Sequence, residues 1–165
     1  MGIRAIFNTS PLIFLTKLEL LEETLLLFES SLITGEVLEE ISARKDNVGD
    51  IITRLIRNGR LNLLEIDNKG LFIALNRILG KGESSVITLA LEKGDLYTYV
   101  ILDDHTARKT AIRFGLKVKG TLGIVRRLYE LNRLSLSASQ LYIKLQNIGF
   151  RVKEEIFREI FKEYL

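Results

Sequence analysis

The sequence of 165 residues contains no cysteine and only one histidine. The lack of cysteine excludes disulfide bonds and thiolate metal sites, and a single histidine leaves little scope for zinc binding or histidine base catalysis. Any metal site must therefore be built from oxygen ligands. No apolar run approaches the roughly 18 residues that span a bilayer, and the N-terminal segment lacks the features of a signal peptide. We therefore expect a cytoplasmic protein with no membrane segment.

The remaining composition is typical of one globular domain, with 47% hydrophobic and 27% charged residues. The net charge of +3 hides a separation of charge along the chain. Residues 1–104 carry 11 basic and 16 acidic side chains, whereas residues 105–165 carry 13 and 5. Basic groups beside an acidic cluster suit a phosphodiester held over metal ions, because the bases neutralise phosphate and the carboxylates hold the cation. The alternative is a solvated basic surface.

The segment 99–125 is central to the prediction. Its apolar run, residues 99–102, predicts a strand buried on both faces. A helix lying on the sheet should follow, with its apolar positions at Ala107, Ala111, Ile112 and Phe114. Asp103 and Asp104 then stand at the carboxyl end of a parallel strand, the edge at which α/β sheets bind ligands. Two carboxylates at this edge favour a cation site.

Short apolar strands alternate with helices along the rest of the chain, which is typical of a parallel sheet covered on both faces. Further strands are predicted at residues 3–7, 31–34, 61–66 and 117–119. Helices are predicted at residues 12–21, 35–45, 47–59, 72–79 and 82–94, and from residue 120 onward. Two amphipathic helices should follow, with apolar positions at Leu141, Leu145, Ile148, Ile156 and Ile160.

Four polar side chains can meet at the carboxyl edge of this sheet. Asn8 and Asp104 follow strands, while Glu40 and Glu83 lie on helices that begin near the same edge. A hard cation such as Mg²⁺ or Mn²⁺ needs few protein oxygens, provided that they converge. With phosphate bound, such a centre supports metal-assisted hydrolysis of a phosphodiester bond.

Each candidate also has a purely structural explanation. Asn8 can cap the first helix, and Asp103 can cap the helix after it, which would leave Asp104 as the only ligand from that strand. Glu83 can serve the dipole of its helix, and Glu40 can be an ordinary solvated glutamate. The remaining polar residues near this edge can satisfy backbone groups or lie at the surface: Ser10, Thr121 and His105.

Five basic residues are candidates for contact with a nucleic-acid backbone: Arg108, Lys109, Arg113, Arg126 and Arg127. Arg108 and Lys109 lie about one helical turn beyond the acidic pair, within reach of a phosphate held there. The alternative is a solvated helix face. The nearby glycines of KGTLG match no phosphate-loop pattern and predict a turn.

Four segments taken together resemble a PIN-domain protein of the prokaryotic subgroup related to VapC toxins. They are FNTSPLIFL, VLEEI, GESSVITLALEKG and LDDHTARKTAIRFGLKVKGTLGIV, and the similarity extends from Ile3 to Leu134. The resemblance implies a three-layer α/β/α PIN-like fold with a central, mainly parallel sheet of four to five strands, plus C-terminal helices. Residues 1–134 would form the PIN-like domain, and residues 135–165 a helical extension packed on it.

The resemblance also implies a site and an activity. The family's four acidic positions correspond to Asn8, Glu40, Glu83 and Asp104, with Ser10 as an accompanying hydroxyl and Asp103 as a further metal ligand. The implied activity is that of a toxin–antitoxin endoribonuclease that uses Mg²⁺ or Mn²⁺ to cleave RNA. The implied partners are a second copy of the chain, in a homodimer, and a small antitoxin protein.

Asn8 departs from the aspartate that catalytically competent members usually carry. An amide oxygen can coordinate a cation, but it brings no negative charge. A second hypothesis is therefore a catalytically impaired PIN-like module that binds RNA or protein. A third, a phosphoacceptor signalling domain, requires an acceptor aspartate on a later strand, and no aspartate follows Asp104.

Overall fold

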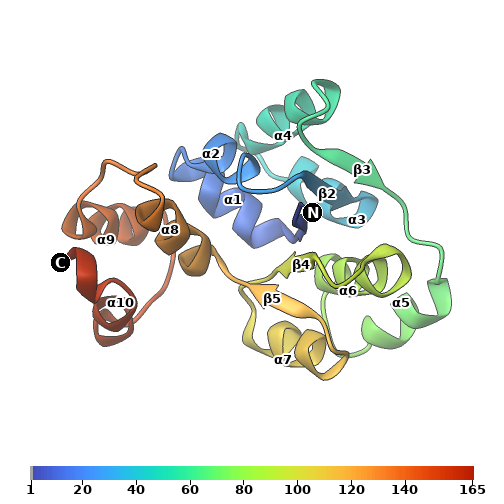
Figure 1. Ribbon diagram of the computed structural model, residues 1–165. Helices are drawn as coiled ribbons and strands as arrows, with labels where there is room; N and C mark the ends of the chain where they lie inside the picture. The colour runs from blue at the N-terminus through green and yellow to red at the C-terminus, as the bar shows by residue number, and fades with distance from the viewer. Residues whose placement is uncertain (1) are drawn as a thin grey trace.

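The computed structural model describes residues 2–165 and contains a five-stranded, fully parallel sheet (Figure 1). The strand order is β3-β2-β1-β4-β5, and every pair of neighbours is parallel. The strands are β1 Arg4–Phe7, β2 Ser30–Thr34, β3 Asn62–Leu64, β4 Thr98–Ile101 and β5 Lys117–Lys119. This confirms the predicted α/β fold with a parallel sheet, although β3 is shorter than the predicted strand at residues 61–66.

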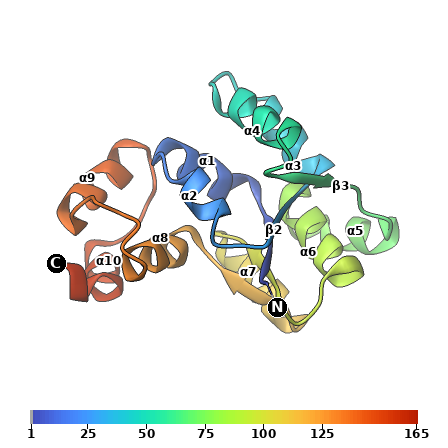
Figure 2. The same ribbon diagram turned by 45° about the horizontal axis from the view of Figure 1, so that its top comes forward.

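Helices cover both faces of the sheet, with α1 (Thr9–Lys17) and α2 (Leu21–Leu25) on one side and α6 (Lys81–Lys93) and α7 (His105–Arg113) on the other (Figures 1 and 2). No helix within residues 2–165 is long and apolar enough to cross a membrane. The helices are α1 Thr9–Lys17, α2 Leu21–Leu25, α3 Gly35–Ser42, α4 Val48–Arg57, α5 Lys69–Leu75, α6 Lys81–Lys93, α7 His105–Arg113, α8 Thr121–Glu130, α9 Ala138–Asn147 and α10 Glu154–Ile160, followed by a 3₁₀ turn, Lys162–Tyr164.

The order of the strands reverses between β1 and β4. From β1 the chain builds β2 and β3 outward in one direction, then returns to place β4 and β5 on the other side of β1. Phe7 is level with Ile101, and the Asn8 backbone N–H donates to the Ile101 carbonyl at 3.0 Å. The polar residues after β1 and β4 therefore lie side by side at a topological switch point, where open α/β sheets bind ligands.

The single helix predicted at residues 12–21 is in fact two helices. Glu19 has a φ of +61°, a left-handed conformation that ends α1. The Leu20 N–H then donates to the Leu15 carbonyl at 2.9 Å, and α2 begins at Leu21. Leu18 and Leu21 are both buried, so the apolar pattern was real although the helix does not continue through it.

Helix α7 buries a narrower face than predicted. Ala107 and Ala111, one turn apart, are fully buried, whereas Ile112 is 59% exposed and Phe114 is 46% exposed. Neighbouring residues in a helix point about 100° apart, so Ile112 cannot share the face of Ala111. Phe114 follows the last helical residue. The prediction that both large side chains pack on the sheet was wrong.

The last two helices lie beside α8, away from the sheet (Figures 1 and 2). This region contributes large buried side chains to the hydrophobic core: Leu141, Leu145, Phe157 and Phe161. Ile156, predicted as an apolar position of an amphipathic helix, is 51% exposed, whereas Phe157 and Phe161 are buried. The division of the chain near residue 134 stays a prediction.

Candidate active site

Asn8 is buried at the end of β1 and occupies the N-cap position of α1. Its side chain nevertheless accepts no capping hydrogen bond. Among the described residues, no donor bonds to Asn8 Oδ1, although this oxygen is shielded from solvent. A buried acceptor without a donor is costly, and a cation at this position would satisfy it. The capping explanation for Asn8 therefore does not account for its side chain.

Gly82 brings the first turn of α6 against Asn8 and Glu40. A Cβ at this position would lie 2.8 Å from Asn8 Oδ1 and would also clash with Glu40 Oε1. The two oxygens thus share one glycine as a neighbour, and a Cβ there would have to displace them. The Thr9 hydroxyl donates to Glu40 Oε1 at 2.6 Å and holds this carboxylate beside the end of β1.

Hydrogen bonds between the end of β2 and α6 hold this helix at the sheet edge. The hydroxyl oxygens of Thr34 and Ser85 are 2.7 Å apart in a buried contact. Ser85 also donates to the Gly82 carbonyl at 2.8 Å. These contacts place Glu83, the residue after Gly82, among the other acidic side chains.

Glu83 is half-buried, and its pKa is raised above the ordinary glutamate value. Burial is the main cause, and the negative charges of Asp104 and Glu40 raise the pKa further. Where carboxylates from three separate elements lie close together, repulsion between their negative charges favours protonation of one of them. A bound cation would remove this repulsion.

The two aspartates after β4 have different roles, and these differ from the predicted alternative in which Asp103 caps the following helix. Asp104 is the N-cap of α7 and accepts from the Ala107 N–H at 2.9 Å. Asp103 turns the other way, accepting from the Thr121 N–H at 2.8 Å and from the Thr121 hydroxyl at 2.6 Å. Asp103 therefore does not cap α7, because both of its oxygens are committed to the start of α8.

The pKa of Asp103 is raised, chiefly by burial, while the two bonds from Thr121 and the charge of Arg108 act in the opposite direction. Arg108 donates to the Leu102 carbonyl at 2.9 Å. Gly120 permits this arrangement, since a Cβ there would lie 2.7 Å from the Arg108 guanidinium and 3.0 Å from Asp103 Oδ1. Asp103 and Arg108 are thus fixed by tertiary contacts.

A cleft of about 750 Å³ opens at this edge of the sheet, although Asn8 and Glu40 are not among the residues that line it. Its acidic lining consists of Glu83, Asp103 and Asp104, and Ser10 and Phe14 of α1 also border it. Three basic residues line the same cleft, which is large enough for a phosphodiester and its neighbouring sugars: Arg108, Lys119 and Arg151. Sequence analysis missed Lys119, Arg151, Thr121 and Gly82 as site residues. The available signals were that Gly82 directly precedes a candidate ligand and that Thr121 is a polar residue predicted near this edge.

The donor set fits a hard divalent cation. Asn8 Oδ1 lacks a donor, and Glu40, Glu83, Asp103 and Asp104 take part in none of the ion pairs within residues 2–165. In that range, no three carboxylate or imidazole groups are already arranged around one point. Side chains held by single hydrogen bonds, such as Glu40 and Asp104, would have to rotate to complete such a site.

The other predicted basic residues lie elsewhere. Lys109 and Arg113 lie on α7 but are not part of the cleft wall. Arg126 bonds to Glu130, to Glu163 and to the Ile160 carbonyl, which ties α8 to the C-terminal segment. Arg127 pairs with Glu130 at 3.0 Å.

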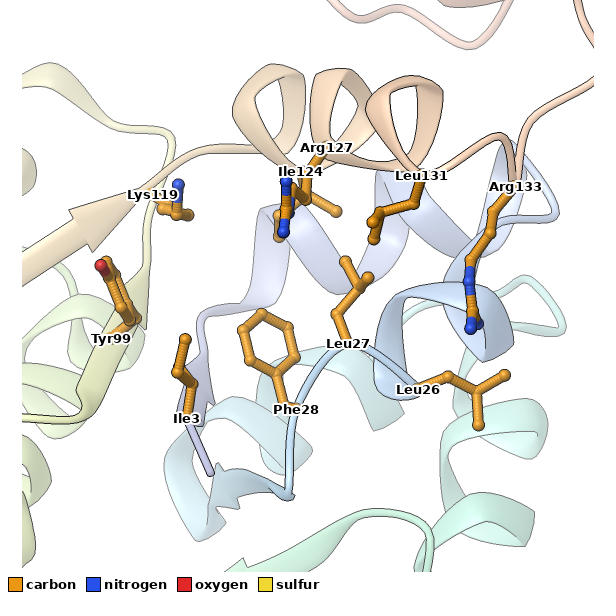
Figure 3. Close-up of a pocket in the computed structure, with 10 residues that line it drawn as sticks. All are labelled: Ile3, Leu26, Leu27, Phe28, Tyr99, Lys119, Ile124, Arg127, Leu131 and Arg133. Carbon is orange, nitrogen blue, oxygen red and sulfur yellow. The ribbon is translucent and has the colours of Figure 1, made fainter. Parts of the chain in front are cut away.

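Arg127 also lines a second cavity of about 370 Å³ (Figure 3). Its apolar side chains lie between Tyr99 and Lys119 at one end and Arg133 at the other. No carboxylate lines this cavity among the described residues, so it has no ligand set for a cation.

The fold and the site define an α/β domain with a cleft at the carboxyl edge of a parallel sheet, lined by both acidic and basic side chains. The profile of a family described as PIN domain matches residues 4–164, so the chain belongs to the PIN-domain family. PIN domains are in general nucleases that act on RNA or other nucleic acids, and they generally use divalent metals. The comparison with curated proteins finds no match to the chain.

Proposed function

We propose that this PIN domain is a divalent-metal-dependent endoribonuclease of the toxin–antitoxin, VapC-like type, which hydrolyses RNA phosphodiester bonds. The observation that carries the proposal is the proximity of four oxygen-bearing side chains near the switch point, one of them with a buried acceptor lacking a donor: Asn8, Glu40, Glu83 and Asp104. Nuclease chemistry in the family and a cleft with basic walls support the same conclusion.

Mg²⁺ or Mn²⁺ would be held by Asn8, Glu40, Glu83 and Asp104. Asp103, whose two oxygens accept from Thr121, would add only a remaining lone pair of its carboxylate. When bound, such a cation activates water and stabilises the negative charge that develops on phosphorus and on the leaving oxygen. The Arg108 guanidinium, fixed against the Leu102 carbonyl, would bind a phosphate oxygen of the RNA in the cleft. Thr121 keeps the Asp103 carboxylate in one orientation before substrate arrives.

The test is cleavage of a mixed single-stranded RNA with Mn²⁺ or Mg²⁺. Asp104→Asn and Glu83→Gln should each lower the rate at least about 100-fold, as expected when a group that stabilises transition-state charge is lost. Asparagine is also a good N-cap, so Asp104→Asn should leave α7 intact. Asp50→Asn, at an exposed aspartate in the first turn of α4, is the matched control. Cleavage that survives in both site variants would refute the proposal.

Asn8 favours a second candidate, a catalytically impaired PIN-like module that binds RNA or protein. With an amide at residue 8, only three of the family's four acidic positions carry a negative charge: Glu40, Glu83 and Asp104. RNA binding without cleavage in either metal would support this alternative.

The VapC-like type also leads us to propose a cytoplasmic homodimer inhibited by a small antitoxin protein. Light scattering should give twice the chain mass of 18.8 kDa. The product of a neighbouring gene should suppress the RNA cleavage.

A further inference from the structure

The segment between α9 and α10 reaches back to the cleft. Phe150, Arg151 and Val152 line the cleft together with the acidic residues, although they lie almost 50 positions further along the chain than Asp103 and Asp104. The cleft therefore has one wall from the sheet edge and another from the C-terminal region.

Local contacts hold this segment in place. Gly149 has a φ of +82°, and the Phe150 N–H donates to the Leu145 carbonyl at 2.9 Å, so α9 ends in a defined turn. The ring of Phe150 then packs edge-on against Phe14 of α1, with centroids 4.9 Å apart. Beyond the segment, Phe157 and Phe161 are buried and Arg126 bonds to the Ile160 carbonyl. The segment is anchored on both sides and is not a loose tail.

Arg151 is exposed and is the charged residue of this segment that lines the cleft. Within residues 2–165 its guanidinium forms no ion pair, even though three carboxylates line the same cleft. The other basic residues there are partly engaged, since Arg108 bonds to a backbone carbonyl and Lys119 lies 5.5 Å from the centre of the Tyr99 ring. Arg151 thus has all of its donors available to an anion that enters the cleft.

We propose that Arg151 binds a backbone phosphate of the RNA strand that occupies the cleft, so that the C-terminal segment supplies part of the substrate site. This inference rests on the proposed function, because it takes RNA as the ligand of the cleft. A planar guanidinium suits a phosphate, with which it forms two parallel hydrogen bonds. The strand would then run from the acidic cluster to the segment that follows α9.

The test measures binding of a fluorescent single-stranded RNA by anisotropy, in EDTA, so that no cleavage is needed. Arg151→Gln should weaken binding about fivefold at low salt, and the slope of log K against log salt should become shallower by about 0.7, the value for one phosphate contact on a single strand. Lys153→Gln is the matched control, because Lys153 carries the same charge two residues away and does not line the cleft. Arg151→Lys should retain most of the salt dependence.

The outcomes separate this inference from the proposed function. Equal weakening by Arg151→Gln and Lys153→Gln, or no weakening by either, would overturn the role of Arg151, even in a protein that cleaves RNA. Selective weakening without any cleavage activity would support Arg151 and refute the ribonuclease. Failure of the unsubstituted protein to bind RNA would overturn the inference as well. Equal melting temperatures of the variants would exclude a folding defect.

Discussion

At the scale of single residues, Asn8 has the largest bearing on function. It stands where the family resemblance places an aspartate, and its buried Oδ1 finds no donor among the described residues. An amide there spares the metal-free protein a further negative charge close to Glu40 and Glu83. The neutral amide also attracts a cation less strongly than a carboxylate would, since Coulomb energy scales with ligand charge.

Asn8→Asp should therefore strengthen Mg²⁺ binding by at least about tenfold, equivalent to ~1.4 kcal/mol. In EDTA the same variant should melt at a lower temperature than the unsubstituted protein, because a buried carboxylate joins an acidic cluster. Isothermal titration calorimetry and thermal unfolding measure the two effects. A variant with unchanged metal affinity would show that residue 8 is not a ligand. A large gain in RNA cleavage would indicate a site that has decayed from an active one.

At the scale of elements, the approach of α6 to the sheet edge decides whether the site can form. Gly82 lies within the first turn of α6, and both Asn8 and Glu40 occupy the space that a side chain would need. Glycine normally weakens a helix relative to alanine, by roughly 1 kcal/mol. Here the missing side chain leaves room for the ends of the Asn8 and Glu40 side chains.

Gly82→Ala should accordingly lower both metal affinity and RNA cleavage, because the new methyl group displaces Asn8 Oδ1 and Glu40 Oε1. Gly70→Ala in α5 is the control, since a Cβ there would meet only Asn68 Oδ1 at an ordinary 3.7 Å. Gly70→Ala should raise the unfolding free energy by up to about 1 kcal/mol and leave metal binding unchanged. If Gly82→Ala behaved like this control, the close packing around Gly82 would not be needed for the site.

At the scale of the whole molecule, the acidic cluster links stability to pH and to metal. The pKa values of Glu83 and Asp103 are raised in the folded protein, so the folded state binds protons more tightly than the unfolded chain. For such groups the free energy of unfolding falls as the pH rises from the ordinary pKa toward the folded pKa. The window opens near pH 4, the ordinary range of these carboxyl groups.

Metal-free protein should therefore lose more stability between about pH 4 and neutrality than Glu83→Gln does, because the amide removes one group with a raised pKa. At neutral pH without metal, the unsubstituted protein should then be the less stable of the two. Saturating Mg²⁺ should make it the more stable one, since only the unsubstituted protein has the full ligand set and binding stabilises the folded state. Urea unfolding in EDTA and in Mg²⁺ at several pH values measures both effects. Identical pH profiles for the two proteins would contradict the assignment of Glu83 to the cluster.

The sequence by itself determined the architecture and the set of candidate ligands. Short continuous apolar runs and helical patterns of period 3.6 depend on near neighbours, so the five strands could be predicted, as could Asp103 and Asp104 at the end of β4. Boundaries were less certain where a single residue decides, as at Glu19, whose left-handed backbone separates α1 from α2.

Only the tertiary structure decided how these groups face one another. Asp103 bonds to Thr121, Gly82 admits Asn8 and Glu40, and Arg151 lines the cleft from the C-terminal region. Each of these contacts joins segments that are distant in sequence and depends on the strand order β3-β2-β1-β4-β5. Periodicity records which face of an element is apolar, but not which residue of another element will pack against it, and the chemistry of this site depends on that packing.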